Sequence, residues 1–425
     1  MVVESWLARA ARERPERAAV NDLTYGALYE RARAAAAGLP RGARVGLAIP
    51  PGEAYVVALH ACLLAGALVV PIDLRLTAAE RPAVDVLVEG AALPVRCARG
   101  AEVRDEHDLD APAILVHTSG TTSAPKPIRL TYGNWLWSAL GSAVALGVDP
   151  AERWLCTLPL SHVGGLSILL RSAIYGTTAI VHERFDTARV LAALRAPDGP
   201  TVVSLVPTTL ARLLDAGLER PPALRWALLG GAPLPPALLA RAAAAGVPVA
   251  PTYGLTEACS QVATAGVPLF CTRVELDGPE GEILVSGPTV SPDAATDDRG
   301  RLHTGDLGAF DASDPARPLR IVGRKADTIV TGGENVAPAE VEAVLEAHPA
   351  VAEAGVTARA DDEWGEAVVA LVRLQAGEDV TPLDLLAHCR AQLARFKVPK
   401  DIQIVADPLP RTPSGKLLRR ELVAL

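Results

Sequence analysis

Residues 113–126, Ala-Ile-Leu-Val-His-Thr-Ser-Gly-Thr-Thr-Ser-Ala-Pro-Lys, join an apolar run to a loop of small and hydroxyl-bearing residues. The run Ala113–His117 predicts a buried strand that leads directly into this loop. Backbone N–H groups and hydroxyls of such a loop can surround phosphate oxygens, and the ammonium of Lys126 can neutralise them. It is not a Walker A loop, because neither GxxxxGK[ST] nor GxGxxG occurs in the chain. We predict a phosphate-binding loop, with a plain Ser/Thr turn as the alternative.

Lysine is rare in this chain, which makes its positions informative. Of 41 basic residues only five are lysine, and two of them, Lys126 and Lys416, lie in loops of Gly, Ser, Thr and Pro. Lysine offers a compact, mobile point charge, whereas arginine offers a planar fork. We expect both lysines to contact phosphate, and chance placement is the alternative.

Composition limits the class of protein. Half of the 425 residues are hydrophobic, enough for a large core in two or three domains, and the net charge is −8. No basic run alternates with aromatic residues, so nucleic acid is not an expected partner. The six cysteines form no CxxC pair, which favours reduced thiols in the cytoplasm. The longest apolar run, residues 54–72, predicts a buried helix feeding a strand rather than a membrane span. No signal peptide is predicted.

Apolar strand-like runs alternate with helical patterns along the first 250 residues, and this alternation predicts α/β architecture with largely parallel sheets. The expected strands are Val45–Ile49, Leu68–Ile72, Ala113–His117, Trp154–Leu158, Thr178–His182, Val202–Val206, Arg225–Leu229 and Val247–Pro251. The expected helices are Glu53–Ala65, Tyr132–Leu146, Gly165–Ile174, Thr187–Ala193, Thr208–Ala216 and Pro235–Ala245.

The pattern changes after about residue 274, where short strand-like segments precede a compact tail of strands and helices. The tail, about 100 residues long, has the size of a small α+β domain. We place the break at Gly323–Asp327, giving a large N-terminal domain, 1–323, and a small C-terminal domain, 324–425.

Four further motifs follow the first loop. Tyr253-Gly254-Leu255-Thr256-Glu257 combines a purine-stacking face, a hydroxyl and a carboxylate suited to Mg²⁺. Asp306, after a glycine, could hold a ribose diol, although a tight turn is the alternative. Gly332-Gly333-Glu334 lets a thin ligand approach the backbone, with a hairpin turn as the alternative. Pro410–Lys416 could bring a mobile cation to phosphate, and a solvated tail lysine is the alternative.

Together, in this order, the five motifs resemble the adenylate-forming superfamily of acyl- and aryl-CoA synthetases, over nearly the whole chain. The resemblance implies a large domain with parallel-rich α/β sheets and a distorted β-barrel, a mobile C-terminal lid, and the use of ATP, Mg²⁺ and CoA. It implies that Lys416, Thr256 and Glu257 are catalytic and that Glu257 binds the metal. The implied nucleotide-binding residues are Thr118, Ser119, Gly120, Thr121, Thr122, Lys126, Gly231, Ala232, Pro233, Thr252, Tyr253, Gly254, Asp306 and Arg324. Gly332, Gly333 and Glu334 would line the CoA channel.

The stretches Gly133–Ala139, Leu158–Arg171 and Thr256–Gln261 look like those of o-succinylbenzoate–CoA ligases of menaquinone synthesis. That acid carries a second carboxylate, which an apolar pocket would have to meet with a cation. Arg171 suits bidentate carboxylate recognition, although a solvated helix face is the alternative. His162 and Ser260 are further candidates for the acid pocket, with a core or loop histidine as the alternative for His162.

The match to the superfamily is incomplete. Ser123 stands where the phosphate loop usually has Gly, Pro127 removes one N–H donor, and Ala326 occupies the usual pivot position. Two alternative functions stay open: an adenylating enzyme that loads a carrier protein, and a nucleotide-binding sensor without turnover. We expect small-molecule partners only, and leave a homodimer open.

Overall fold

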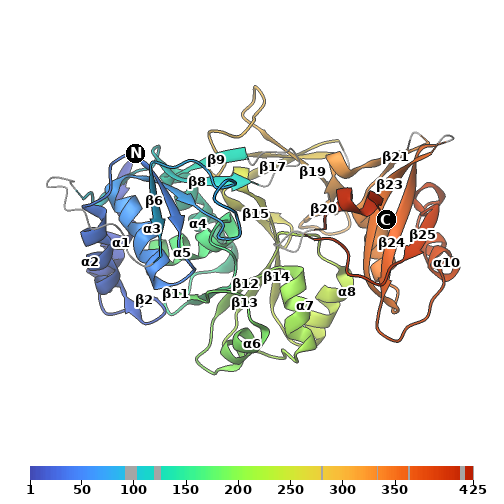
Figure 1. The fold of residues 1–425 in the computed structure, drawn as a ribbon, viewed down its shortest axis with the longest axis horizontal. Coiled ribbons are helices and arrows are strands. Elements are labelled where there is room, and N and C mark those ends of the chain that lie inside the picture. The colour runs from blue at the N-terminus through green and yellow to red at the C-terminus, as the bar shows by residue number, and fades with distance from the viewer. Residues whose placement is uncertain are drawn as a thin grey trace.

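The computed structural model describes residues 1–90, 103–118, 126–278, 281–332, 334–361, 364–411 and 417–424. A large lobe carries the sheets of the N-terminal three quarters of the chain, and a small lobe lies at one end of the molecule (Figure 1). Strand β20 (Leu319–Arg324) leads from the first lobe towards the second.

Two mixed sheets form the body of the large lobe. The nine-stranded sheet has the order β16 (Val267–Pro268), β15 (Ser260–Thr264), β14 (Val249–Leu255), β13 (Trp226–Leu229), β12 (Val202–Leu205), β10 (Arg153–Cys156), β11 (Thr178–Val181), β2 (Ala18–Val20), β3 (Leu23–Thr24). The five-stranded sheet has the order β6 (Val86–Glu89), β4 (Arg44–Ala48), β5 (Leu68–Pro71), β8 (Pro112–Thr118), β9 (Lys126–Thr131). All pairs from β11 through β10 to β14 are parallel, as are the β6–β4–β5–β8 pairs. The predicted parallel-rich α/β class is confirmed.

Helices α1 (Trp6–Glu13), α2 (Tyr25–Ala36), α3 (Glu53–Ala65), α4 (Tyr132–Leu146), α5 (Val163–Tyr175), α6 (Thr187–Arg195), α7 (Pro207–Asp215) and α8 (Pro236–Ala244) accompany these sheets. Helix α3 is apolar on all sides and buried along most of its length, as its sequence requires. It ends at Gly66, whose φ of 66° favours glycine. The run 54–72 is therefore a buried helix and strand. Among the described residues, none of the helices combines the length and apolar character needed to cross a bilayer.

A third sheet of the large lobe has the order β17 (Arg273–Asp277), β18 (Glu282–Ser286), β19 (Leu302–Phe310), β20. All its neighbouring pairs are antiparallel. Where the family resemblance implies a distorted barrel, the described residues form an open sheet, since β17 and β20 are its two edges and do not pair with each other.

The small lobe has its own sheet and core. Strand order is β22 (Glu334–Val336), β21 (Ile329–Thr331), β24 (Gly365–Leu374), β23 (Val351–Asp361), with β25 (Asp401–Ile404) pairing to β24. Helices α9 (Pro338–Glu346) and α10 (Pro382–Gln392) complete it. Its main cluster of buried apolar side chains comes from residues 329–402, and a smaller one joins Leu371 to Leu409 and Leu422, as expected for a domain with its own core. The exact division at 323/324 stays a prediction; Arg324 still pairs with Asp306 in the β19–β20 ladder.

Glu346, at the end of α9, predicts a pH-dependent stability of the small lobe. Burial, reinforced by the carboxylates of Glu342 and Glu353, raises the pKa of Glu346 from 4.5 to about 7. The folded chain therefore keeps this proton between pH 4.5 and 7 while the unfolded chain loses it, so stability is present below pH 4.5 and lost as pH rises through 7. Glu346→Gln should remove this loss, raising the melting temperature at pH 8 by a few degrees relative to the parent and by less at pH 5. The matched control is Glu378→Gln, at an exposed position of the same lobe; an equal gain in both variants would contradict the assignment.

Candidate active site

The candidate site lies where the parallel strands of the nine-stranded sheet end. Strands β10, β12, β13 and β14 run in the same direction, so their carboxyl ends meet at one edge. Ligands of open α/β sheets bind at this edge. The predicted segments at His162 and Gly230–Pro233 follow β10 and β13, and Tyr253–Glu257 begins in the last residues of β14 and continues beyond it. The sheet therefore gathers segments that are as much as 95 residues apart in the sequence.

The segments proposed to hold adenine lie against each other. Gly230 packs so tightly on β14 that an added Cβ would lie 2.4 Å from Oγ1 of Thr252. Gly254 has still less room, because an added Cβ would lie 1.6 Å from the carbonyl oxygen of Ser260. Glycine is required at both positions, since backbone atoms or the Thr252 side chain occupy the space. Gly231, Ala232 and Pro233 follow in the loop after β13, and Gly231 has a φ of 81°.

Tyr253, Asp306 and Arg324 come together as one hydrogen-bonded group. The Tyr253 hydroxyl donates to Oδ2 of Asp306 at 2.9 Å, and Nε of Arg324 donates to Oδ1 at 2.8 Å. Asp306 is only 7% exposed. Burial, and then the Asp306 charge, raise the pKa of Tyr253 above its ordinary value. The tyrosine therefore stays protonated, and Asp306 accepts hydrogen bonds from both neighbours.

Thr256 and Glu257 lie in a short 3-10 helix, η1 (Thr256–Ala258), that is held by a strained turn. Cys259 and Ser260 both have left-handed backbone, with φ of 51° and 85°, which costs energy for residues with a side chain. The hydroxyl of Ser138 in α4 donates to the Cys259 carbonyl oxygen at 2.7 Å. The Glu257 carbonyl oxygen accepts from the N–H of Ser291 at 2.7 Å. These two bonds fix the segment on both sides.

The Glu257 side chain fits a magnesium ligand. It is partly exposed, and no ion pair among the described residues involves it. Those residues contain no group of three or more His, Cys, Asp or Glu side chains that could hold a metal alone. Magnesium commonly takes one or two carboxylates and completes its shell with substrate phosphates and water. A single carboxylate beside a nucleotide site meets that requirement.

Arg171 is a buried cation without an acidic partner among the described residues. Arg171 is 4% exposed, and its guanidinium lies 5.6 Å from the ring centroid of Trp154. Nη2 donates to Oγ of Ser138 at 3.1 Å, while Nε has no hydrogen-bond partner in the described part of the chain. Burial lowers the pKa of Arg171 from its ordinary value. The alternative of a solvated helix face is thus wrong: Arg171 lies inside, one hydroxyl away from the Cys259 turn.

The two other acid-pocket candidates flank this region. His162 precedes α5 and is partly exposed; burial lowers the pKa of its imidazole, and the Asp73 carboxylate opposes that change. Ser260 is the first residue of β15, is partly exposed and follows the strained Cys259. A neutral imidazole and a hydroxyl are therefore the polar groups offered here.

Several predicted residues lie outside the described part of the chain: Ser119, Gly120, Thr121, Thr122, Gly333 and Lys416. The described ends of the phosphate loop pair in register, Thr118 opposite Lys126, in the β8–β9 hairpin. At the proposed CoA channel, Gly332 has a φ of 59° and donates its N–H to the Trp364 carbonyl oxygen at 2.9 Å. Glu334 is exposed in β22.

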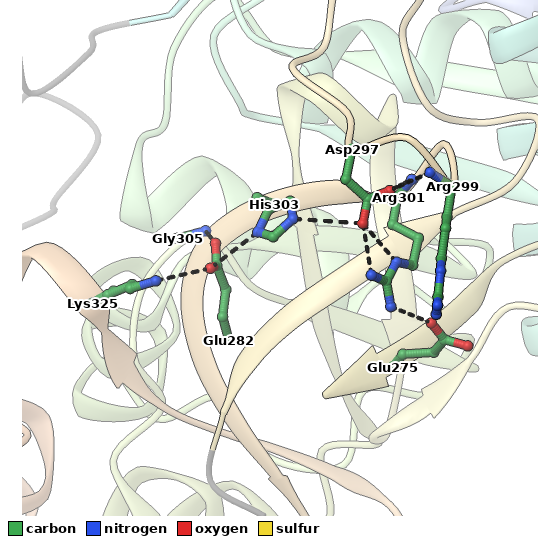
Figure 2. Close-up of polar contacts among 8 residues, drawn as sticks. All are labelled: Glu275, Glu282, Asp297, Arg299, Arg301, His303, Gly305 and Lys325. Atoms are coloured by element: carbon green, nitrogen blue, oxygen red, sulfur yellow. Dashed lines mark hydrogen bonds and ion pairs between the residues drawn. The ribbon is translucent and has the colours of Figure 1, made fainter. Parts of the chain in front are cut away.

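Two residues of the site are not found by sequence reasoning. Ser138 links Arg171 to the Cys259 turn, and Glu282 holds the backbone beside Asp306, accepting from the N–H of Gly305 at 2.9 Å (Figure 2). Ser138 lies within a stretch that resembles the ligases. Its bond to Cys259 joins residues 121 positions apart, so no local pattern could indicate it. Glu282 begins an ordinary strand pattern, and nothing local marks its role.

Comparison with known proteins agrees with this geometry. The chain matches the model of AMP-binding enzymes over residues 7–84 and 82–293, and that of the AMP-binding enzyme C-terminal domain over residues 340–416. It is 37% identical over 484 residues to the 2-succinylbenzoate–CoA ligase of Bacillus licheniformis, covering 98% of this chain and 99% of that protein.

The fold is similar to solved structures of o-succinylbenzoate coenzyme A synthetase from Bacillus subtilis. The complex with the acyl-adenylate intermediate OSB-AMP has a TM-score of 0.88 at 33% identity, covering 99% of this chain and 98% of that one. The complex with ATP and magnesium ion has a TM-score of 0.89 at 33% identity, covering 99% and 100%. With its motifs, its sheets and its two lobes all matched, this chain belongs to the AMP-binding enzyme family, the adenylate-forming superfamily.

Proposed function

We propose that this chain is an AMP-forming acid–CoA ligase that converts o-succinylbenzoate, ATP and CoA into o-succinylbenzoyl-CoA, AMP and pyrophosphate in menaquinone biosynthesis. The observation that carries the choice of acid is Arg171, a buried cation that has no acidic partner among the described residues. A buried cation is costly unless an anion meets it, and the second carboxylate of this substrate would supply that anion. The identity of about 37% to 2-succinylbenzoate–CoA ligases over the whole chain supports the same acid.

In the first step an oxygen of the acid's reactive carboxylate attacks the α-phosphorus of ATP. A new P–O bond forms, the bond to the β-phosphate oxygen breaks, and pyrophosphate leaves. Asp306, with Arg324 beside it, would hold the ribose, and Tyr253 would place the adenine. Lys416 and Thr256 would stabilise charge on the α-phosphate, as phosphoryl transfer requires. Mg²⁺ at Glu257 would neutralise phosphate charge.

In the second step the thiol of CoA attacks the carbonyl carbon of the mixed anhydride. A C–S bond forms, the C–O bond to AMP breaks, and the thiol proton is lost to solvent or a base. Gly332, Gly333 and Glu334 would line the pantetheine path, and the absence of a side chain at Gly332 leaves its backbone accessible beside Trp364. A swing of the C-terminal domain, 324–425, between the steps would withdraw Lys416.

His162 and Ser260 would complete the acid pocket, since His162 immediately precedes the helix that holds Arg171, and Ser260 follows Cys259, which Ser138 links to Arg171. The first phosphate loop, Thr118–Lys126, would hold the β- and γ-phosphates. A cytoplasmic location and a homodimer remain predictions; the free thiols at five described cysteines support a reducing compartment.

An acid panel tests the proposal. Purified protein is supplied with ATP, Mg²⁺ and labelled pyrophosphate, and exchange is measured with o-succinylbenzoate, benzoate and fatty acids. We expect o-succinylbenzoate to exceed benzoate in kcat/KM by about 100-fold or more, the scale of leaving a buried charged group unpaired. CoA is then added, and the thioester is detected by mass.

Each alternative gives a different result in this assay. Equal use of benzoate and o-succinylbenzoate would contradict the proposed acid. Exchange without thioester formation from CoA would favour loading of a carrier protein. Absence of acid-dependent exchange with every acid would favour a nucleotide sensor.

A further inference from the structure

Glu282 is a buried carboxylate whose two oxygens serve different parts of the molecule (Figure 2). It is the first residue of β18 and is 7% exposed. Oε1 accepts from the N–H of Gly305, while Oε2 accepts from Nζ of Lys325 at 3.2 Å and lies 3.2 Å from Nδ1 of His303. None of the five sequence motifs includes Glu282.

The first oxygen holds the turn that presents Asp306. Glu282 pairs with Leu307 and Leu284 pairs with His303, so β19 has two more residues than β18 between these points. The extra residues form a bulge at Gly305, whose φ is 71°. The Gly305 N–H bond to Glu282 and the Thr304 hydroxyl bond to the Ile283 carbonyl oxygen fasten this bulge to β18. The side chain of Asp306 can then meet Tyr253 and Arg324.

The second oxygen holds the beginning of the linker between the lobes. Lys325 follows Arg324 directly, and both contact the large lobe, Arg324 through Asp306 and Lys325 through Glu282. Two residues later, Oδ2 of Asp327 accepts from Nη1 of Arg419 at 3.0 Å. Arg419 also donates to Glu342 of the small lobe. The attachment of the chain thus changes from one lobe to the other across Ala326.

The two contacts of Glu282 differ in strength. We call the Oε1 bond from Gly305 the first arm and the Oε2 ion pair with Lys325 the second arm. The bond from Gly305 lies at a buried carboxylate and is charge-assisted, which makes it strong. The Lys325 side chain is 65% exposed, and an ion pair with so exposed a partner contributes little to stability. The first arm therefore holds the turn firmly, while the second can be released at small cost when the linker moves.

We propose that Glu282 is a positioning residue that couples nucleotide binding to the linker: one oxygen fixes the Asp306 turn, and the other clamps Lys325 while the adenylate forms. The inference rests on the proposed function, because it takes Asp306 as the ribose ligand and Ala326 as the pivot. The clamped arrangement belongs to a structure that resembles the ATP and OSB-AMP complexes described above. Glu282 itself touches no reacting atom.

Three substitutions separate the arms. Glu282→Ala removes both, whereas Glu282→Gln keeps an oxygen for the Gly305 N–H but loses the charge that attracts Lys325. Lys325→Met removes the ammonium and keeps much of the side-chain length. Arg12→Ala is the matched control, because Arg12 is also an exposed cation that pairs with a glutamate, Glu4. Arg12 lies on α1, at the far end of the large lobe (Figure 1).

Direct binding of Mg²⁺-ATP to each full-length variant, measured by calorimetry, reports on the first arm. We expect Glu282→Ala to raise the Kd by roughly tenfold or more, the scale of a lost hydrogen bond to a charged group. Glu282→Gln, Lys325→Met and Arg12→Ala should stay within about threefold of the parent, because each keeps the Gly305 bond. An equal rise in Glu282→Gln and Glu282→Ala would overturn the proposed role of the first oxygen.

The half-reactions report on the second arm. Acid-dependent pyrophosphate exchange measures adenylate formation, and a single turnover of preformed OSB-AMP with CoA measures thioester formation. Glu282→Gln and Lys325→Met should each lower the ratio of the first rate to the second by about two- to fivefold, the scale of one exposed or partly exposed ion pair. The double variant should show no further change, because both substitutions break the same contact.

An unchanged ratio in both single variants, or additive effects in the double variant, would overturn the coupling. A purely structural role would lower the melting temperature without changing this ratio. If Glu282→Ala does not fold, the Gln and Met variants still decide between these outcomes. If the parent chain activates no acid, the proposed function fails, while the ATP affinities, which need no acid, still test the first arm.

Discussion

Replacing Lys416 by alanine is expected to lower acid-dependent adenylate formation by about 10²–10³-fold or more, the scale on which enzymes lose rate when one preorganised donor is removed. The reason is the charge of the first transition state. The attacking carboxylate and the α-phosphate are both anionic, and a cation between them is needed only while the new P–O bond forms. Pyrophosphate exchange measures this step.

The same Lys416→Ala variant should convert preformed OSB-AMP and CoA into thioester within about threefold of the parent rate. In that step the electrophile is a carbonyl carbon, and the proposed domain swing has withdrawn the lysine. Lys400→Ala, at an exposed lysine of the same lobe, is the control for the first step and should leave exchange unchanged. An equal fall of both half-reactions in Lys416→Ala would contradict this division of labour.

Replacing Arg171 by methionine is expected to raise the KM for o-succinylbenzoate by about 100-fold, since truncating one partner of a buried charge pair costs about 2–5 kcal/mol. Methionine keeps an unbranched side chain in the buried space and removes only the charge and the donors. The KM for ATP should change less than about twofold, because Tyr253 and Asp306, the proposed nucleotide ligands, contact each other and not Arg171. Charge reversal by Arg171→Glu should weaken binding of o-succinylbenzoate further.

Two further measurements separate acid binding from a positioning role of Arg171. Ser138→Ala removes the hydroxyl partner of Arg171 but keeps the cation, so the KM for o-succinylbenzoate should rise less than in Arg171→Met. If both variants instead weaken the binding of ATP and of o-succinylbenzoate equally, Arg171 acts through Ser138 on the strained Cys259 turn. The assignment to the second carboxylate would then be wrong.

Local patterns carried most of the fold prediction. Helices α3 and α4 begin and end at the predicted residues, because each is an apolar run that stops at a glycine, Gly66 or Gly147, and α4 also begins after the N-cap residue Thr131. Strand β19 extends over nine residues, from Leu302 to Phe310, where the sequence predicts only short strands after about residue 274. The strand contains Gly305 and the bulge, so alternation of apolar and polar residues is lost there, and pairing with β18 and β20 keeps the strand extended.

Sequence motifs selected the candidate site residues, whereas tertiary structure decided how they are arranged. Motif order was sufficient to select Tyr253, Asp306 and Arg324, but their hydrogen bonds depend on strand register and on a bulge. The same limit explains why Arg171 allowed two interpretations. A single arginine in an apolar helix has no local signal that tells a buried position from an exposed one.

By itself, the sequence determined the family chemistry, the α/β alternation and most candidate ligands, because these depend on residues that are neighbours in the chain. Only the tertiary structure decided that Arg171 is buried without an acidic partner among the described residues, and that Glu282 joins the Asp306 turn to Lys325. The physical reason is that the cost of a buried charge and the direction of a hydrogen bond are set by groups tens of residues away, which meet only when the sheets have formed.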